Sequence, residues 1–131
     1  MILLDTHALV WWQDSSARLS SKALSAITHE AHCGTLVISA FSFWEIALLI
    51  EHNLLALSSN LPDWIAKVEA TKQMRFVPVD NHIAVASVRL PAGLHKDPAD
   101  RIIVATAMLL DIPLVTADRQ LRAYPHVRTI W

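Results

Sequence analysis

Residues 95–119 read His-Lys-Asp-Pro-Ala-Asp-Arg-Ile-Ile-Val-Ala-Thr-Ala-Met-Leu-Leu-Asp-Ile-Pro-Leu-Val-Thr-Ala-Asp-Arg. Asp97 before Pro98 predicts a helix start, because aspartate is a favoured N-cap and proline is favoured at the first helical position. The apolar helix is expected over about 99–110, and Pro113 prevents it from continuing. A short strand follows at once, as is typical of an α/β unit.

Two carboxylates of this stretch are expected near one edge of a sheet. Residues 112–115 form a short buried strand that runs into Asp118, whereas Asp100 lies in the first turn of the preceding helix. Near the other end of the chain, residues 1–4 form a second apolar strand that leads directly into Asp5. Ligands of open parallel sheets bind at the carboxyl ends of the strands, so neighbouring strands here would bring the three aspartates together.

Apolar strands and helices alternate along the rest of the chain. Further strands are expected at 36–39, 75–79 and 127–130. Further helices are expected at 6–13, 20–33, 41–52, 61–72 and 80–90, with one short turn at 118–122. Five short strands alternating with helices predict an α/β fold with a mainly parallel sheet. The length of 131 residues predicts a single domain, 1–131.

Composition excludes several classes of protein. The net charge is −1, which argues against bulk coating of nucleic acid. Only two glycines occur, Gly34 and Gly93, so neither a P-loop nor a G-x-G-x-x-G dinucleotide site is possible. The apolar runs are too short for a membrane span and no basic signal-peptide start is seen. The lone Cys33 fits a reducing cytoplasm.

Glu45 is the most informative single residue. It lies inside an otherwise apolar helix, where a carboxylate is costly to bury unless it is paired or bound to a metal. The alternative is exposure at the helix edge. Asp5, Asp100 and Asp118 can each be explained singly as helix-capping residues, a role that suits Asp97 best. Together with Glu45, however, they converge on one edge of the expected sheet.

Four crowded carboxylates would repel one another without a cation, and hard oxygen ligands select Mg²⁺ or Mn²⁺. Such ions activate water and stabilise the charge that grows on a phosphate, so the acids point to metal-dependent phosphodiester hydrolysis. Thr116 could orient Asp118 or a water molecule, or could simply be a β-branched strand residue. His7 and His95 lie near the expected site, but the chemistry requires neither. Arg101 and Arg119 are candidates to hold a substrate phosphate.

Large aromatic residues are concentrated in two expected helices, 6–13 and 41–52. Some of them could be core, but so many in a small domain suggest that part of the set faces a partner surface. The residues concerned are Trp11, Trp12, Phe41, Phe43 and Trp44.

Four motifs in this order resemble a known family. They are Asp5-Thr6-His7, Ser42-Phe43-Trp44-Glu45-Ile46, Asp97-Pro98-Ala99-Asp100-Arg101 and Val115-Thr116-Ala117-Asp118. They resemble the PIN domain and, more narrowly, the VapC toxins of bacterial toxin–antitoxin pairs. The resemblance covers the whole chain and implies a three-layer α/β/α fold with a five-stranded sheet.

The resemblance also implies an activity, a cofactor and partners. The activity is metal-dependent endoribonuclease action, with Mg²⁺ or Mn²⁺ held by the acidic quartet. The family's residues carry over to Asp5, Glu45, Asp100, Asp118 and Thr116. A homodimer and a VapB-type antitoxin are also implied, and an apolar groove would receive the antitoxin. Candidates for that groove are Trp11, Trp12, Phe43 and Trp44.

Two alternatives remain open from the residues themselves. One is a different metal-dependent phosphoesterase or DNA nuclease on the same kind of sheet. The other is a non-catalytic interaction module, in which the acids cap helices and the aromatic residues bind a partner.

Overall fold

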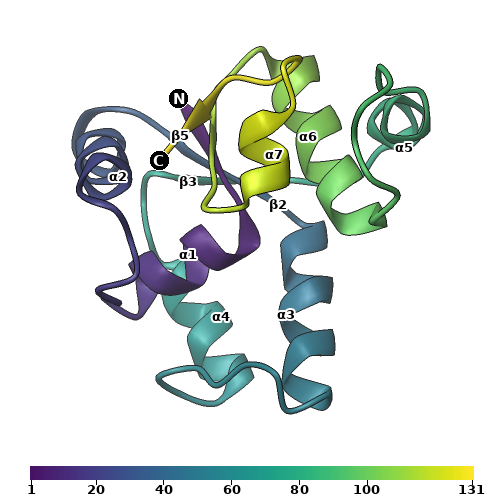
Figure 1. The fold of residues 1–131 in the computed structure, drawn as a ribbon. Coiled ribbons are helices and arrows are strands. Elements are labelled where there is room, and N and C mark those ends of the chain that lie inside the picture. The colour runs from purple at the N-terminus through teal and green to yellow at the C-terminus, as the bar shows by residue number, and fades with distance from the viewer.

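The computed structural model describes all 131 residues, which form a five-stranded sheet flanked by helices (Figure 1). The strands are β1 (Ile2–Leu4), β2 (Leu36–Ser39), β3 (Met74–Val77), β4 (Leu114–Val115) and β5 (Thr129–Ile130). Their order is β3-β2-β1-β4-β5 and every pair is parallel. The expected contact between the two Asp-terminated strands is present, because Leu3 pairs with Leu114 and Leu4 with Val115.

Seven helices connect the strands. They are α1 (Thr6–Gln13), α2 (Ser21–Cys33), α3 (Phe41–Glu51), α4 (Leu61–Glu69), α5 (Asn81–Val88), α6 (Pro98–Leu110) and α7 (Arg119–Ala123). Four element ends were predicted too far along the chain, including those of α3 and α5, which end at Glu51 and Val88. Helix α4 ends three residues before Lys72, and β3 ends before Pro78, which has no N–H to donate to a neighbouring strand. No helix has both the length and the apolar character that a membrane span needs.

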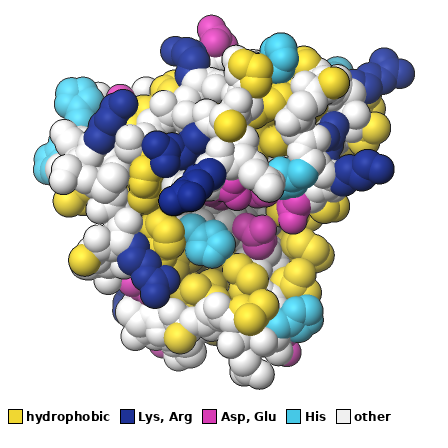
Figure 2. Space-filling model, in the orientation of Figure 1, with side chains coloured by type: hydrophobic (Ala, Val, Ile, Leu, Met, Phe, Trp, Pro, Cys, Tyr) yellow, Lys and Arg dark blue, Asp and Glu magenta, His cyan; other side chains and the backbone are white.

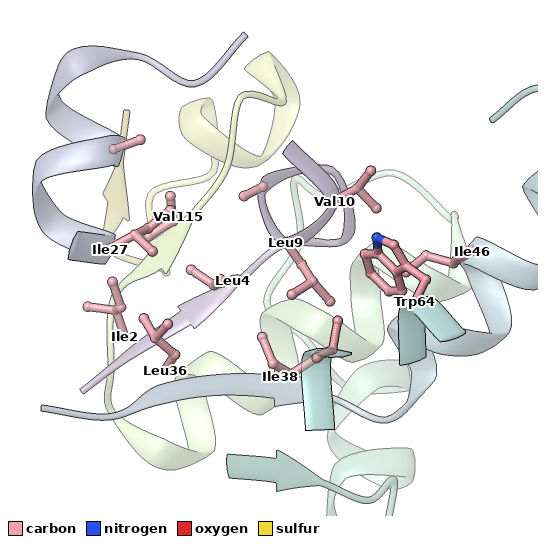
Figure 3. Close-up of a cluster of buried hydrophobic side chains, with 13 residues drawn as sticks. Ile2, Leu4, Leu9, Val10, Ile27, Leu36, Ile38, Ile46, Trp64 and Val115 are labelled. Carbon is pink, nitrogen blue, oxygen red and sulfur yellow. The ribbon is translucent and has the colours of Figure 1, made fainter. Parts of the chain in front are cut away.

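Alternate residues of the strands face opposite layers, which gives the three-layer architecture. Leu4 and Ile38 belong to one hydrophobic cluster, to which α1, α2, α3 and α4 contribute and in which Trp64 is fully buried (Figure 3). Leu3 and Val37 directly precede these two residues on β1 and β2, and they belong to a second cluster built with α5, α6 and α7. This alternation is the period of two that a sheet buried on both faces requires.

The sheet topology brings three strand ends together. Strand β1 lies between β2 and β4, so the segments that leave these three strands start at neighbouring points on the carboxyl edge. Asp5 follows β1, α3 begins two residues after β2, and Asp118 follows β4 by three residues. The N-terminal end of α6 reaches the same edge, because α6 contacts α3. Figure 1 shows α1, α3, α6 and α7 around this region.

Candidate acidic metal centre

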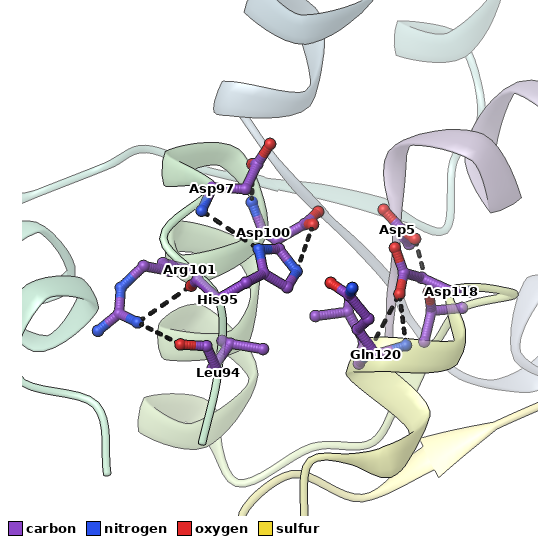
Figure 4. Close-up of polar contacts among 10 residues, drawn as sticks. Asp5, Leu94, His95, Asp97, Asp100, Arg101, Asp118 and Gln120 are labelled. Carbon is purple, nitrogen blue, oxygen red and sulfur yellow. Dashed lines mark hydrogen bonds and ion pairs between the residues drawn. The ribbon is translucent and has the colours of Figure 1, made fainter. Parts of the chain in front are cut away.

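The structure brings the four predicted acids together in one pocket at the carboxyl edge of the sheet. We call this hollow of about 360 Å³ the acidic pocket. It is lined by Asp5, His7, Trp11, Glu45, Asp97, Asp100, Ala117 and Asp118. In Figure 2 its acidic side chains are the magenta group near the middle of the face, and Figure 4 shows the carboxylates of Asp5, Asp97, Asp100 and Asp118.

Helix starts supply most of these carboxylates. Asp5 is the N-cap of α1 and accepts the Thr6 N–H at 2.6 Å. Asp118 is the N-cap of α7, and its Oδ1 accepts N–H bonds from the first turn at 2.7 and 3.2 Å. Asp100 lies in the first turn of α6. Each acid therefore lies near the positive end of a helix dipole, which favours negative charge there.

Thr116 couples two of the acids. Its hydroxyl donates to Asp5 Oδ2 at 2.6 Å. The Thr116 Oγ1 atom also accepts a hydrogen bond from the Asp118 N–H at 3.1 Å. Thr116 is fully buried and Asp5 is only 6% exposed. Thr116 therefore contacts Asp118 through the backbone N–H, whereas the carboxylate that its hydroxyl bonds is that of Asp5. Thr116 thus sets the orientation of the Asp5 carboxylate and the start of α7 together.

Crowding of the carboxylates changes the acidity of two of them. Burial, followed by the charges of the neighbouring acids, raises the pKa of Asp100 from 3.8 to about 7. Those neighbours are Asp5, Asp97, Asp118 and Glu45. Burial also raises the pKa of Asp5, although the Thr116 hydroxyl, His7 and the Thr6 N–H oppose it. Both shifts show that negative charge is disfavoured here without a counter-charge.

The residues of the pocket fit a divalent cation. Glu45, Asp97 and Asp100 each present a carboxylate oxygen, and these oxygens lie within 4.8 Å of one another. An all-oxygen, multiply charged donor set of this kind suits Mg²⁺ or Mn²⁺ rather than zinc. A cation there would remove the repulsion that raises the pKa of Asp100.

Asp97 is a member of the acidic pocket that the sequence did not reveal. It was expected only to cap α6, and its Oδ1 does accept the Asp100 N–H at 3.0 Å. Its carboxylate nevertheless also faces Glu45 and Asp100. The spacing Asp-x-x-Asp across a helix start was the available signal, because an N-cap and a residue of the first turn can lie side by side.

His95 makes the closest basic contact with the cluster (Figure 4). Its Nε2 lies 3.2 Å from Asp100 Oδ2, although the ring is not aligned for a hydrogen bond. Its Nδ1 accepts the Asp97 N–H at 3.2 Å, which leaves the ring proton on the Nε2 that faces Asp100. His7 is exposed, lines the same pocket and contacts Trp11, with ring centroids 5.6 Å apart and the rings tilted by 50°.

Arg101 does not have the phosphate-binding geometry that was expected of it. Its guanidinium donates to four backbone carbonyls at 2.8 to 3.3 Å, two of which, those of Leu94 and His95, are drawn in Figure 4. These are the carbonyls of Ser87, Val88, Leu94 and His95. With four of its five N–H groups used, Arg101 joins the end of α5 to the loop that carries His95. Arg119, in contrast, is exposed and lines a neighbouring groove.

The four aromatic residues expected in one apolar groove have different surroundings in the structure. Phe43 packs against Phe76 of β3, whereas Trp44 is 53% exposed and stacks on Phe41. Their separation follows from geometry, since consecutive residues of a helix point in different directions. Trp11 lines the acidic pocket, and Trp12 is half-buried against the first cluster.

Comparison with known proteins gives the class of this fold and site. Residues 2–127 match the model of the PIN domain. The chain is also 36% identical to Ribonuclease VapC22 of Mycobacterium tuberculosis, over 99% of this chain and 98% of that protein. The chain therefore belongs to the PIN-domain family, and within it to the VapC proteins.

Solved structures agree with this fold at low sequence identity. VapBC2 from Rickettsia felis, bound to a DNA fragment from its promoter, superposes with a TM-score of 0.69 at 16% identity, covering 98% of this chain and 97% of that chain. VapC20 of Mycobacterium tuberculosis, described as a toxin that cleaves the sarcin-ricin loop, gives 0.66 at 12% identity, with 98% and 99% covered. These likenesses confirm the fold predicted from the sequence.

Proposed function

We propose that this protein is a metal-dependent endoribonuclease, the toxin of a VapBC toxin–antitoxin pair, and that residues 1–131 form its single PIN domain. The observation that carries the proposal is the convergence of buried and half-buried carboxylates in the acidic pocket, with the pKa of Asp100 raised to about 7. The relative VapC22 is named a ribonuclease, which supports RNA as the substrate.

Mg²⁺ or Mn²⁺ is the proposed cofactor, with Asp5, Glu45, Asp100 and Asp118 as its ligands and Asp97 as an additional candidate. When bound, such an ion lowers the pKa of water and offsets the charge that develops on a phosphate. The protein's own part is to hold the carboxylates in place. Asp5 is fixed from two sides, by Thr116 Oγ1 at 2.6 Å and the Thr6 N–H at 2.6 Å, so its oxygens cannot rotate away.

The proposed partners are RNA, a VapB-type antitoxin and a second copy of the chain. The structural relative from Rickettsia felis is a VapBC assembly, which supports an antitoxin as partner. Exposed apolar side chains on α3, Trp44 at 53% and Leu48 at 37%, support a protein interface on that helix.

An RNA-cleavage assay tests the proposal. The substrate is a short RNA with a fluorophore and a quencher, and the additions are Mg²⁺, Mn²⁺ or EDTA. We expect cleavage only with the metals and a loss of more than about 100-fold in Asp100→Asn and Asp118→Asn, beyond what a supporting group usually costs. Asparagine keeps the acceptor that caps α7, so folding is retained. Glu51→Gln, which changes the same charge on an exposed residue, is the matched control.

Two companion substrates separate the alternatives. Preferential cleavage of single-stranded DNA, or of a small phosphomonoester, would replace the ribonuclease by another phosphoesterase of the same fold. Metal-independent behaviour with no cleavage of any substrate would support the non-catalytic module. Growth arrest on expression of the chain alone, absent for Asp118→Asn, would support the toxin role.

A further inference from the structure

We propose that a groove between α2 and α7 binds the phosphodiester backbone of single-stranded RNA and leads the strand into the acidic pocket. This inference rests on the proposed function, because it concerns the path of the substrate. We call the hollow the basic groove. It is lined by Lys22, Arg119, Arg122, Ala123, Thr129 and Trp131.

Three unpaired cations converge on the basic groove. Lys22 extends from α2, whereas Arg119 and Arg122 are three residues apart on α7 and so lie on the same side of that short helix. All three are exposed, and none of them takes part in a salt bridge. Like charges gathered without acidic partners repel one another, so a polyanion laid across them relieves the repulsion. The net charge of −1 makes this a local feature rather than a property of the whole surface.

The basic groove lies next to the acidic pocket. Arg119 directly follows Asp118, which lines the pocket. On the other side, the indole of Trp131 packs against that of Trp11 with ring centroids 5.9 Å apart, and Trp11 lines the pocket as well. Figure 2 shows Lys and Arg side chains immediately beside the magenta acidic group on this face. A strand bound in the groove therefore passes over the carboxylates.

The basic groove suits an unpaired strand better than a duplex. Trp131 forms part of its wall and is half-buried, so the position of the indole is set by Trp11 and the first hydrophobic cluster. Single-stranded RNA is recognised by stacking of splayed bases on aromatic side chains, together with cations that follow the backbone. The basic groove offers both kinds of contact. A paired helix keeps its bases stacked inside and cannot use the indole.

The cations of the basic groove also offset the repulsion between the acidic pocket and the RNA phosphates. The acidic pocket alone repels a phosphate, since at least five carboxylates line it. Cations at its rim attract the phosphates on either side of the cleavage site. They thereby hold the RNA strand with the scissile phosphate close to the carboxylates. Arg101 is poorly placed to bind a phosphate directly, because four of its five N–H groups are bonded to backbone carbonyls.

A pair of triple variants tests the basic groove. The groove variant is Lys22→Gln, Arg119→Gln and Arg122→Gln. The matched control is Lys67→Gln, Lys72→Gln and Arg75→Gln, three exposed cations without salt bridges on and near α4 and β3. Each triple removes three positive charges from the net −1. The probe is a fluorescent single-stranded RNA of mixed sequence, and binding is measured by anisotropy in EDTA, so that no cleavage occurs.

We expect the groove variant, but not the control, to lose affinity and salt dependence. Each lost phosphate contact makes the slope of log affinity against log salt less steep by about 0.7, or about 2 for three contacts. Wild-type affinity should then fall about 20-fold more than that of the groove variant between about 50 and 200 mM salt. Trp131→Leu should weaken binding by about 5- to 150-fold and Trp131→Phe should largely retain it.

The outcomes distinguish the basic groove from the proposed function. If both triples bind RNA alike, or if double-stranded RNA is preferred, the groove is wrong even where the wild type cleaves RNA with metal. If the groove variant alone loses binding but the wild type cleaves nothing, the groove holds and the ribonuclease proposal fails. With both correct, the groove variant raises KM and leaves kcat near the wild-type value, whereas substitution of Asp100 lowers kcat.

Discussion

Replacing Asp100 by asparagine should make the metal-free protein more stable. Asp100 is surrounded by carboxylates, and burial and their charges raise its pKa to about 7. Asparagine has nearly the same shape but carries no charge, so the variant avoids the repulsion that ionised Asp100 creates. Loss of a residue of the acidic pocket thus increases stability, as expected where a site is strained in the absence of its ligand.

The size of the effect follows from linkage. The folded-state pKa of Asp100 is about 7 and its ordinary value is 3.8. A group with a raised pKa contributes stability that is complete below the unfolded pKa and is lost as the pH rises through the folded one. At about 1.36 kcal/mol for each pH unit between the two values, the loss above pH 7 is about 4 kcal/mol at most. Because the side chain is 18% exposed, water screens part of this, and we expect about 2–4 kcal/mol.

Thermal melting in EDTA at about pH 5 and about pH 8 measures about two-thirds of this difference, because the loss already begins at pH 3.8. Wild type should melt lower at the higher pH, whereas Asp100→Asn should change much less. At about 3–5 °C for each kcal/mol in a domain of this size, the variant should melt about 6–20 °C above wild type at pH 8. The control Glu51→Gln, on an exposed acid, should melt like wild type.

Addition of Mn²⁺ or Mg²⁺ at pH 8 should reduce this difference in melting temperature. An ion at a hundred times its Kd stabilises the folded wild type by about 2.7 kcal/mol, and the variant gains less because it has lost a ligand. If Asp100→Asn melts at or below wild type in EDTA at pH 8, the carboxylates do not repel one another. The proposed metal site would then be refuted together with the pH dependence.

Three further substitutions test individual contacts. Asp14→Ala should lower the free energy of unfolding by about 1–3 kcal/mol in urea, because it leaves the N–H of the buried Trp64 without its 2.8 Å acceptor. Arg101→Gln should destabilise the protein and weaken Mn²⁺ binding, measured by calorimetry, since its bonds hold the loop that carries the histidine beside Asp100. Thr116→Val should lower kcat for RNA by about 10- to 100-fold with the fold retained, because Asp5 loses its hydroxyl donor.

Conservative variants serve as controls for these three. Asp14→Asn keeps an acceptor for the indole and should recover most of the lost stability. Thr116→Ser keeps the hydroxyl and should retain most activity, so equal activity of the valine and serine variants would contradict the role of that bond. Unchanged Mn²⁺ affinity in Arg101→Gln would mean that the loop keeps its place without the guanidinium.

Helix bounds were predictable because their signals are local. Helix α1 covers Thr6–Gln13 as expected, and α2 begins after Ser20, whose side chain accepts the Ala23 N–H within one turn. Strand bounds were less predictable because they depend on a neighbour distant in the chain. Strand β4 was expected over 112–115 but pairs only over Leu114–Val115, where β1 is opposite.

The role of Arg101 could not be predicted for a related reason. Because Arg101 follows Asp100 in the sequence, it was predicted to bind a substrate phosphate next to that acid. Its carbonyl partners lie 6 to 14 residues away along the chain and become neighbours only when α5 packs on α6. No local pattern encodes that contact. The convergence of the acids was predictable, in contrast, because parallel strands place their ends at one edge.

Helix capping and metal binding were posed as rival explanations of the acids, and the structure shows that they are compatible. An ionised carboxylate has about four acceptor positions on two oxygens, and an N-cap bond occupies one of them. Asp97 and Asp118 both cap through Oδ1, and no hydrogen bond is made by their Oδ2 atoms within the protein. The helix N–H groups and dipoles stabilise the acids while the pocket is open to water, which limits their mutual repulsion. The carboxylate of Asp100 has no backbone N–H donor, so burial and the repulsion of its neighbours raise its pKa.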